Sequence, residues 1–213
     1  MTVKLISVTP DAEQTMAYIA RVSNPANQMN SATSEKLIKY LIDHKHWSPL
    51  EMVDATIEIE TTRDIARQML RHRSFSFQEF SQRYADVSDL DDEMFEYCEV
   101  RLQDTKNRQN SIEVDDNLLQ NEWFRAQQRV IYAAQREYAW AIQNGIAKEQ
   151  ARAVLPEGIM GSRLYMNGTM RSWVHYIQLR SANGTQKEHR EVALACVDAI
   201  EPIFPMIKEF VNE

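Results

Sequence analysis

The segment Arg71–Tyr84 holds the densest group of side chains that could bind an anion. Arg71, His72 and Arg73 open it, hydroxyls and one acid follow, and Arg83 lies near its end. A guanidinium presents a planar fork of donors that matches a phosphate or carboxylate edge to edge. The segment therefore indicates an anion-binding site, although three cations ending a helix would also complement the negative end of the helix dipole.

Cations elsewhere in the chain suggest a ligand with more than one anionic group. Of the 24 basic residues, 16 are arginines, which favours geometric recognition over diffuse positive charge. Arg152, Arg171 and Arg180 lie far from the first segment in sequence, and the loop His44–Pro49 is rich in donors. Aromatic side chains near these cations could stack on bases. Nucleotides are the ligands that account for all of these features together.

A protein that binds single-stranded nucleic acid is an alternative reading of the same residues. Its arginines would contact phosphates, while Phe75, Phe77, Phe80 and Tyr84 would stack on bases. The formal net charge of −7 opposes this alternative, because broad attraction to nucleic acid requires a positive surface. Steep salt dependence of oligonucleotide binding would favour it.

Other chemistries fit the sequence less well. Cys98 lies among acidic residues and Cys196 within an apolar helical pattern, and both surroundings disfavour a thiolate, so we expect both thiols to be inert. Ser81 lacks the Gly-x-Ser-x-Gly elbow and an evident base. His44 and His46 have no further ligand at metal-site spacing. The sequence predicts neither a metal site nor a cysteine nucleophile.

Composition and length set the expected cellular setting. The amino terminus has no apolar core typical of a signal peptide, and no apolar run is long enough to cross a bilayer. We therefore expect a cytoplasmic protein that does not enter membranes, with residues 1–213 forming one domain.

Hydrophobic periodicity predicts the elements that position these residues. Only 5 glycines occur, which favours long helices over tight turns. Alternation predicts strands, and apolar residues at intervals of three and four predict helices. In the first part of the chain we expect a strand at 3–8, helices at 11–20 and about 37–42, a strand at 53–60, and a helix that starts at Arg63 behind a Thr61-Thr62 cap.

The helix that starts at Arg63 is expected to run into the Arg-His-Arg triplet. Arg63, Arg67 and Arg71 would then form a stripe on one face, with Ile65 and Met69 facing the protein. Like charges at this interval destabilise a helix by only about 0.2–0.5 kcal/mol per pair, so the stripe is tolerable on a surface.

The second part of the chain is expected to be mainly helical. We interpret the acidic segment Asp86–Asp116 as a helix within an excursion of unknown role. A long helix should cover 117–142 and stop at Asn144-Gly145. A strand near 159–166 should lead through a Thr169 cap into a helix carrying Arg171 to Arg180, and a last helix should be bent or broken near Pro202 and Pro205.

At these residues the sequence resembles the flavin-dependent thymidylate synthases. Their signature is Arg-His-Arg, seven residues and then Ser, which matches Arg71–Arg73 and Ser81. Further matching stretches follow in the family's order: Ala20–Ser23, His46–Glu51, Ala66–Gln68, Glu79, Arg83-Tyr84, Arg152–Pro156 and Arg171–Trp173 through Leu179-Arg180. The ordered series makes the resemblance specific.

The resemblance implies a fold, an assembly and a reaction. The fold would be α+β, a twisted and mainly antiparallel sheet flanked by helices, some of them long. The protein would be a homotetramer with FAD and nucleotide sites at subunit interfaces. Reduced FAD and methylenetetrahydrofolate would convert dUMP to dTMP, NADPH would reduce the flavin, and no enzyme cysteine would attack the pyrimidine.

The resemblance also implies roles for individual residues. Arg180 matches the cation that would stabilise negative charge on the uracil ring, and His46 matches a residue near flavin and folate. Flavin contacts are implied for Ser48, Arg71, His72, Arg73, Glu79, Thr169, Arg171 and His175, with Ser23 and Glu51 as further positions. dUMP contacts are implied for Gln68, Arg71, Glu79, Phe80, Ser81, Gln82, Arg83, Arg152 and Arg180.

The chain departs from the family pattern at two positions. Gln78 stands where many members carry Asn, and Gly184 stands where many carry a His that reaches the flavin. The segment Asn183–His189 could supply the missing contacts in another way.

Overall fold

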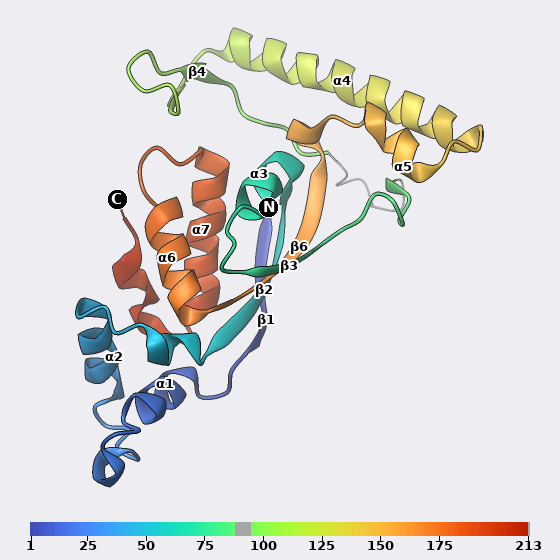
Figure 1. The fold of residues 1–213 in the computed structure, drawn as a ribbon. Helices are drawn as coiled ribbons and strands as arrows, with labels where there is room; N and C mark the ends of the chain where they lie inside the picture. The colour runs from blue at the N-terminus through green and yellow to red at the C-terminus, as the bar shows by residue number, and fades with distance from the viewer. Residues whose placement is uncertain (88–94, 213) are drawn as a thin grey trace. The chain divides into compact units, whose positions relative to one another are not determined.

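The computed structural model describes residues 1–87 and 95–212, which form two compact units (Figure 1). The first unit contains residues 1–59, 72–78 and 165–213, and the second contains 60–71 and 79–164. One four-stranded sheet has the strand order β1-β2-β6-β3, and a separate two-stranded sheet pairs β4 with β5. The α+β class with an antiparallel sheet flanked by helices is confirmed, whereas the single domain stays a prediction.

Strands β2 (Asp54–Thr62) and β6 (Gly161–Thr169) are neighbours in the sheet, and polar side chains also form hydrogen bonds between them. Tyr165 donates to Glu58 at 2.5 Å and Asn167 donates to Thr56 at 2.8 Å. From Thr56 to Glu58 the residue numbers rise along β2, while those of the partner residues in β6 fall from Asn167 to Tyr165. The two strands are therefore antiparallel. The opposite face of β2 is buried, as its alternation of apolar and polar residues predicts.

The first unit builds its core from both ends of the chain. It contains β1 (Thr2–Val8) and the carboxy-terminal helices α6 (Met170–Arg180) and α7 (Lys187–Ile200), and α7 packs against both β1 and α6. Trp173 is fully buried and donates from Nε1 to the carbonyl of Ala55 at 3.2 Å. The remaining elements of this unit are α1 (Ala12–Ala20), η1 (Pro25–Asn27), α2 (Ser34–Asp43), η2 (Ser48–Glu51) and η7 (Pro205–Phe210).

The second unit is organised around the long helix α4 (Asn117–Gln143). The Asp116 carboxylate caps α4 by accepting from the N–H groups of Leu118 and Leu119, and Gly145 follows it with a φ of 73°. Its buried core consists of Val87, Tyr138, Ala141, Ala151 and Met160. The other elements are α3 (Arg63–Met69), β4 (Arg101–Gln103), β5 (Ser111–Glu113), α5 (Lys148–Ala151), η5 (Arg152–Val154) and η6 (Glu157–Ile159).

Most of the expected elements are present at their expected positions, including the strand at 2–8, the helix at 117–143 and the Thr169 cap. The Thr169 hydroxyl accepts from the N–H of Ser172 at 3.3 Å. The last helix ends at Ile200, close to the expected break at Pro202. Thr62 stands at the N-cap of α3, but its hydroxyl donates to the Asp64 carboxylate instead of capping a backbone N–H.

Two expectations about local structure were wrong. Helix α3 ends at Met69, so the Arg-His-Arg triplet lies beyond it and the three-arginine stripe does not form. Arg63 is buried while Arg67 is exposed and pairs with Glu157. In the segment Asp86–Asp116 the described residues form the antiparallel β4–β5 hairpin in place of the expected helix, and residues 88–94 lie outside the described range.

The short strand β3 (Ser76–Glu79) was not predicted from the sequence. It carries part of the anion-binding segment into the sheet, directly before Phe80 and Ser81. A four-residue strand shows too little alternation of apolar and polar residues to be recognised from the sequence.

Candidate functional site

Three rings in the first unit lie near α6, of which Tyr176 and His189 are buried and His72 is partly buried. The Arg180 Nε donates to His72 Nε2 at 2.9 Å, and the His72 ring meets Tyr176 edge-on with centroids 5.0 Å apart. Tyr176 in turn forms a hydrogen bond with His189 Nε2 at 3.1 Å. The cluster therefore joins the middle residue of the Arg-His-Arg triplet to helices α6 and α7.

His72 must be neutral to serve as an acceptor for Arg180. Burial, and then the positive charge of Arg180, lowers the pKa of His72 to about 4. Because Nε2 accepts from a guanidinium, the ring proton of neutral His72 must lie on Nδ1. Burial together with Arg180 and His72 lowers the pKa of His189 to about 3. Burial also raises the pKa of the Tyr176 phenol. The hydrogen bond from Arg180 to the neutral His72 ring therefore orients the guanidinium.

These histidines predict a loss of stability in mild acid. Their folded pKa values lie near 4 and 3, below the unfolded value of about 6.5, so the unfolded chain binds more protons as the pH falls through this window. Between pH 7.5 and pH 5.5, protonation of the unfolded chain at His189 should lower the free energy of unfolding by about 1.4 kcal/mol. The contribution of His72 should be smaller, because His72 is partly exposed. Thermal melts from pH 7.5 to 5 measure this. A His189→Gln variant should show a shallower pH dependence, and an equal slope would contradict the assignment.

A second group in the first unit lies at the start of α6. Arg171 pairs with Glu51, and its Cζ lies 6.0 Å from the centroid of the Trp47 ring. His175 meets Trp47 edge-on at 4.8 Å. Burial, and then Arg171, lowers the pKa of His175. This group combines a cation, a neutral imidazole and an indole, which suits a ligand with both an anionic part and a flat ring.

Three further donors that the resemblance implies for the site lie at the surface, two of them in or next to the loop before η2. Ser48 begins η2 and is exposed, as are His46 and Arg73. Lys45 adopts a left-handed φ of 58°, which turns the chain so that the His46 N–H bonds the Leu41 carbonyl at 2.7 Å. The structure places His46 next to the ring of His44, with centroids 6.3 Å apart.

The second unit contains a largely buried pair of an acid and a cation, Glu79 and Arg63, and Glu79 belongs to the anion-binding segment. The Glu79 carboxylate accepts from the Ser162 hydroxyl at 2.9 Å and lies 3.5 Å from Arg63 NH1. Both Arg63 and Glu79 have side chains that are less than a fifth exposed. Burial lowers the pKa of Arg63, and Glu79 partly offsets this. Within residues 1–87 and 95–212, Arg63 NH1 has no hydrogen-bond partner, so Glu79 compensates its charge through space.

The turn after β3 brings further predicted residues together in the second unit. Arg83 pairs with the Glu149 carboxylate at 3.4 Å, and Arg152 Nε donates to the Glu149 carbonyl at 3.2 Å. Gln82 is 5% exposed, and its amide nitrogen has no hydrogen-bond partner in the part of the chain that the structure describes. An unpartnered buried donor costs free energy, which a bound acceptor would recover.

Ser81 and Phe80 have positioning roles in this turn. The Ser81 hydroxyl accepts from the N–H of Arg83 at 3.4 Å, which holds the turn. The N–H of Phe80 donates to the Arg163 carbonyl at 2.8 Å, which extends the pairing of β3 with β6 by one residue. Gln68 is partly buried on α3, and Arg71 is exposed just beyond it.

The nucleic-acid alternative loses one of its stacking residues. Phe75 is buried, and its ring lies 4.8 Å from that of Trp173, so it belongs to the core of the first unit. Gly168 lies so close that an added Cβ would come within 2.4 Å of the Phe75 ring. Tyr84, by contrast, is 83% exposed.

The two thiols differ in their surroundings. Cys196 is fully buried on α7, and burial raises the pKa of its thiol, which disfavours the thiolate. Cys98 donates from Sγ to the Gly158 carbonyl at 3.5 Å. Across the described residues, no helix is long and apolar enough to cross a membrane.

Comparison with known proteins identifies the family. Residues 4–206 match the model of the family described as "Thymidylate synthase complementing protein". The chain belongs to this family. It is 48% identical to a probable flavin-dependent thymidylate synthase of Paramecium bursaria Chlorella virus 1, over 97% of each chain. It is 47% identical to the flavin-dependent thymidylate synthase of a Synechocystis strain, over 92% of this chain and 87% of the relative.

The family fold is also that of a solved enzyme. The UMP/dUMP methylase PolB from Streptomyces cacaoi, bound with 5-Br dUMP, superposes with a TM-score of 0.83 at 26% identity, covering 98% of this chain and 93% of that one. The resemblance inferred from the Arg-His-Arg motif and its ordered partners is therefore confirmed.

Within this family frame, the predicted residues divide between the units. The first unit holds most of the implied flavin set: Ser48, His72, Arg73, Thr169, Arg171 and His175. The second holds most of the implied dUMP set: Gln68, Arg71, Glu79, Phe80, Ser81, Gln82, Arg83 and Arg152. Direct contacts join His72 to Arg180, and Glu149 connects Arg83 with Arg152.

Sequence reasoning missed four residues that support these groups: Arg63 as a buried partner of Glu79, Ser162, Tyr176 and His189. His189 could have been found, because it lies on the same apolar stripe of α7 as Val192, Cys196 and Ile200. A histidine on such a stripe needs a hydrogen-bond partner inside the protein.

Proposed function

We propose that the chain is a flavin-dependent thymidylate synthase that reductively methylates dUMP to dTMP. Methylenetetrahydrofolate would donate the carbon unit, NADPH would reduce the FAD, and no cysteine would attack the pyrimidine. The observation that carries the proposal is the match to family members of this name over nearly the whole chain, joined to the hydrogen bond of Arg180 to a neutral, partly buried His72.

The residues of the first unit fit a flavin nucleotide. Arg171, Arg73 and the Ser48 hydroxyl would hold the anionic pyrophosphate, because cations and hydroxyl donors match phosphate oxygens. His72 and His175 have depressed pKa values, so both present neutral rings at pH 7. When bound, the flavin supplies the hydride for the reaction. The chain's own part is to hold this group and to keep the imidazoles unprotonated.

The residues of the second unit fit a nucleoside monophosphate. Arg83 and Arg152 would bind the phosphate, and Ser81 would add a hydroxyl donor. The buried amide nitrogen of Gln82 would find its missing acceptor on the ligand. Glu79 would hold this region in place through Arg63 and Ser162.

Arg180 is the residue proposed to assist the chemistry. Carbon 5 of uracil becomes nucleophilic when negative charge builds up on the ring, and a fixed guanidinium beside the ring stabilises that charge. The hydrogen bond to neutral His72 fixes the plane of the Arg180 guanidinium without neutralising it. His46 is proposed to steer the proton or methylene transfer from its exposed loop.

The proposal has further parts that concern the assembly and the setting. The enzyme would be a homotetramer with its sites at subunit interfaces, and residues 1–213 would act as one domain in the cytoplasm. Nucleic acid and membranes would not be partners.

Absorption spectroscopy combined with a turnover assay tests the proposal. The purified protein, supplied with FAD, should show flavin bands that change when dUMP is added, and dTMP should form when NADPH and methylenetetrahydrofolate are present. Replacing dUMP by UMP separates a strict thymidylate synthase from a methylase that accepts both nucleotides. Absence of bound flavin together with absence of dTMP would overturn the proposal.

A further inference from the structure

Tyr176 and His189 form a buried polar pair to which the proposed chemistry gives no part. The side chain of Tyr176 is 1% exposed and that of His189 is fully buried. The Tyr176 hydroxyl lies 3.1 Å from His189 Nε2, and this hydrogen bond joins α6 to α7. The neighbours of His189 on the buried stripe of α7 include Val192 and Cys196. Because two apolar side chains of the same shape would fill such a space about as well, packing alone does not explain a polar pair here.

The pair contacts the residue that holds Arg180. The His72 ring meets the Tyr176 ring edge-on at 5.0 Å and lies 6.3 Å from the His189 ring. Arg180 follows Tyr176 by four residues on α6, so their side chains share one face of the helix. Arg180 donates from Nε to His72 Nε2 at 2.9 Å. His72 therefore meets this face of α6 at two points, a ring edge and a hydrogen bond.

The backbone beside His72 is anchored by other contacts. The Ser172 hydroxyl donates to the Ser74 carbonyl at 3.1 Å, and the Phe75 N–H donates to the His72 carbonyl at 3.2 Å. The Phe75 ring is itself buried in the core of the first unit. These contacts fix where the His72 side chain leaves the backbone, but a side chain can still choose among its rotamers. The Tyr176 ring is the contact that limits rotation of the imidazole.

The pair acts on His72 through position and not through charge. Burial raises the pKa of the Tyr176 phenol and lowers the pKa of His189 to about 3, so both groups are neutral at neutral pH. A hydrogen bond between neutral groups brings no net charge toward His72. It tethers the far end of the Tyr176 ring to α7, and buried networks of this kind make side chains rigid. The edge that meets His72 is thereby held in place.

We propose that Tyr176 and His189 are positioning residues for Arg180, which hold the His72 ring where it accepts the Arg180 hydrogen bond. Arginine has several rotatable bonds, and Arg180 is the last residue of α6, where the helix provides no following turn. Its guanidinium depends on partners outside the helix for a fixed direction. The series of contacts starts on α7 at His189, passes through Tyr176 and His72, and ends at Arg180.

Proton exchange at Arg180 measures the positioning directly and needs neither flavin nor substrate. In protein labelled with ¹⁵N-arginine, the Arg180 Nε–H resonance is identified by its absence from the Arg180→Lys spectrum. Tyr176→Phe removes the hydroxyl and keeps the ring. It should raise the exchange rate of this proton with water about tenfold or more, because the His72 acceptor is no longer held in place. Unchanged exchange in both Tyr176→Phe and His189→Leu would overturn the proposal.

Turnover separates positioning from a contribution to stability. Tyr176→Phe and His189→Leu should each lower the turnover number for dTMP formation roughly tenfold, because a displaced group loses part of its effect on the reaction. The double variant Tyr176→Phe/His189→Leu should melt at a higher temperature than His189→Leu, since no Tyr176 hydroxyl stays buried without a partner. Its turnover should nevertheless stay low. A double variant that turns over at the wild-type rate would contradict positioning by the pair.

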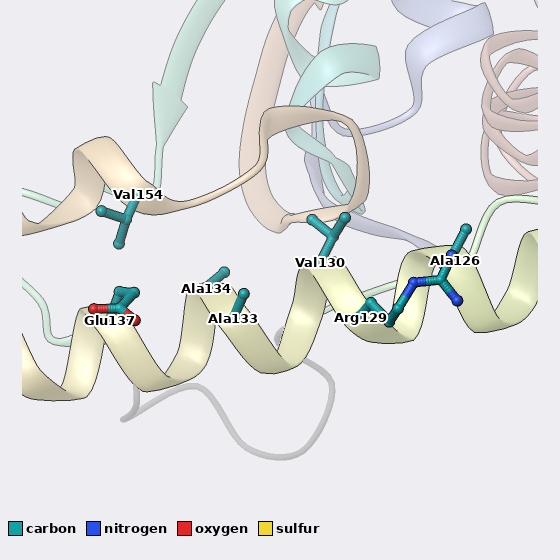
Figure 2. Close-up of a pocket in the computed structure, with 7 residues that line it drawn as sticks. All are labelled: Ala126, Arg129, Val130, Ala133, Ala134, Glu137 and Val154. Atoms are coloured by element: carbon teal, nitrogen blue, oxygen red, sulfur yellow. The ribbon is translucent and has the colours of Figure 1, made fainter.

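A conservative variant and a matched control complete this experiment. His189→Gln should keep most of the turnover, because the new amide can still bond the Tyr176 hydroxyl. Tyr138 lies in the second unit on α4, the helix that lines the groove shown in Figure 2. Tyr138 is 3% exposed, and its hydroxyl accepts from the Val87 N–H at 3.2 Å. Tyr138→Phe also removes a buried hydroxyl and should leave turnover unchanged; a loss equal to that of Tyr176→Phe would count against the proposal.

This inference rests on the proposed role of Arg180, and the outcomes distinguish the two. A lower rate in Arg180→Ala, with wild-type rates and wild-type proton exchange in the variants of the pair, overturns the positioning alone. A wild-type rate in Arg180→Ala contradicts the role of Arg180 and the positioning together. In the Arg180→Ala background, Tyr176→Phe should cause no further loss, because it acts through Arg180. Additive losses would show that Tyr176 acts by another route.

Discussion

Replacing Arg180 by alanine should lower the turnover number for dTMP formation by about 10²–10³-fold or more, while bound flavin and the size of the assembly are retained. The expected factor is that of removing one preorganised donor aimed at developing negative charge. Arg180 stands at the end of α6, and its Nε hydrogen bond to His72 fixes its plane, so its effect depends on orientation as well as charge. Stopped-flow or steady-state assays with saturating dUMP measure this change.

Arg180→Lys is the matched control for this prediction. Lysine keeps the positive charge but lacks the planar fork, so it should restore only part of the lost rate. If charge alone mattered, the lysine variant would equal the wild type. Loss of folding in both variants, seen as a collapse of the melting temperature, would show that Arg180 is a structural cation and would contradict the proposed role.

The sequence predicted the regular elements where periodicity is long enough to be unambiguous. The long helix α4 carries apolar residues at helical spacing over its whole length, with an acid before it and Asn144-Gly145 after it. Short elements were not predicted, because they are too short to show a period. Strand β3 has four residues, and the β4–β5 hairpin has strands of three, so neither contains a full period pattern.

The prediction of an arginine stripe was wrong because the spacing of residues in the sequence does not show which of them the tertiary fold buries. Arg63, Arg67 and Arg71 have perfect four-residue intervals, yet α3 stops at Met69 and Arg63 turns inward to Glu79. Helix α3 ends before Arg71, so only Arg63 and Arg67 lie within it. The correct signal was a glutamate sixteen residues later, which only the pairing of β3 with β6 brings into reach.

The flavin and dUMP sets were predicted from motifs by resemblance, and they stay predictions. The residues that support these sets in the structure were not predicted. The cluster of His72, Tyr176 and His189 joins three segments that lie far apart in sequence, and no local pattern records that they meet. The sequence indicated chemistry at single positions, and the fold adds the neighbouring rings, of which neutral His72 accepts a hydrogen bond from Arg180.

Replacing Glu79 by alanine should destabilise the protein by about 3–5 kcal/mol, because it leaves the Arg63 guanidinium buried without its compensating carboxylate. For a chain of this size the melting temperature should fall by roughly 10 °C. Glu79→Gln should cost less, because the amide oxygen still accepts from the Ser162 hydroxyl. Differential scanning calorimetry at pH 7.5 compares the three proteins.

A double variant separates the charge effect from a loss of packing. Arg63→Met/Glu79→Leu removes both charges and fills the space with apolar groups, so it should be more stable than Glu79→Ala, since replacing a whole buried pair is often neutral. If Glu79→Ala alone melts within a degree of the wild type, solvent already compensates Arg63. The dUMP set would then not depend on this pair, and the anion-binding segment would be held by the Ser81 turn and the pairing of β3 with β6 instead.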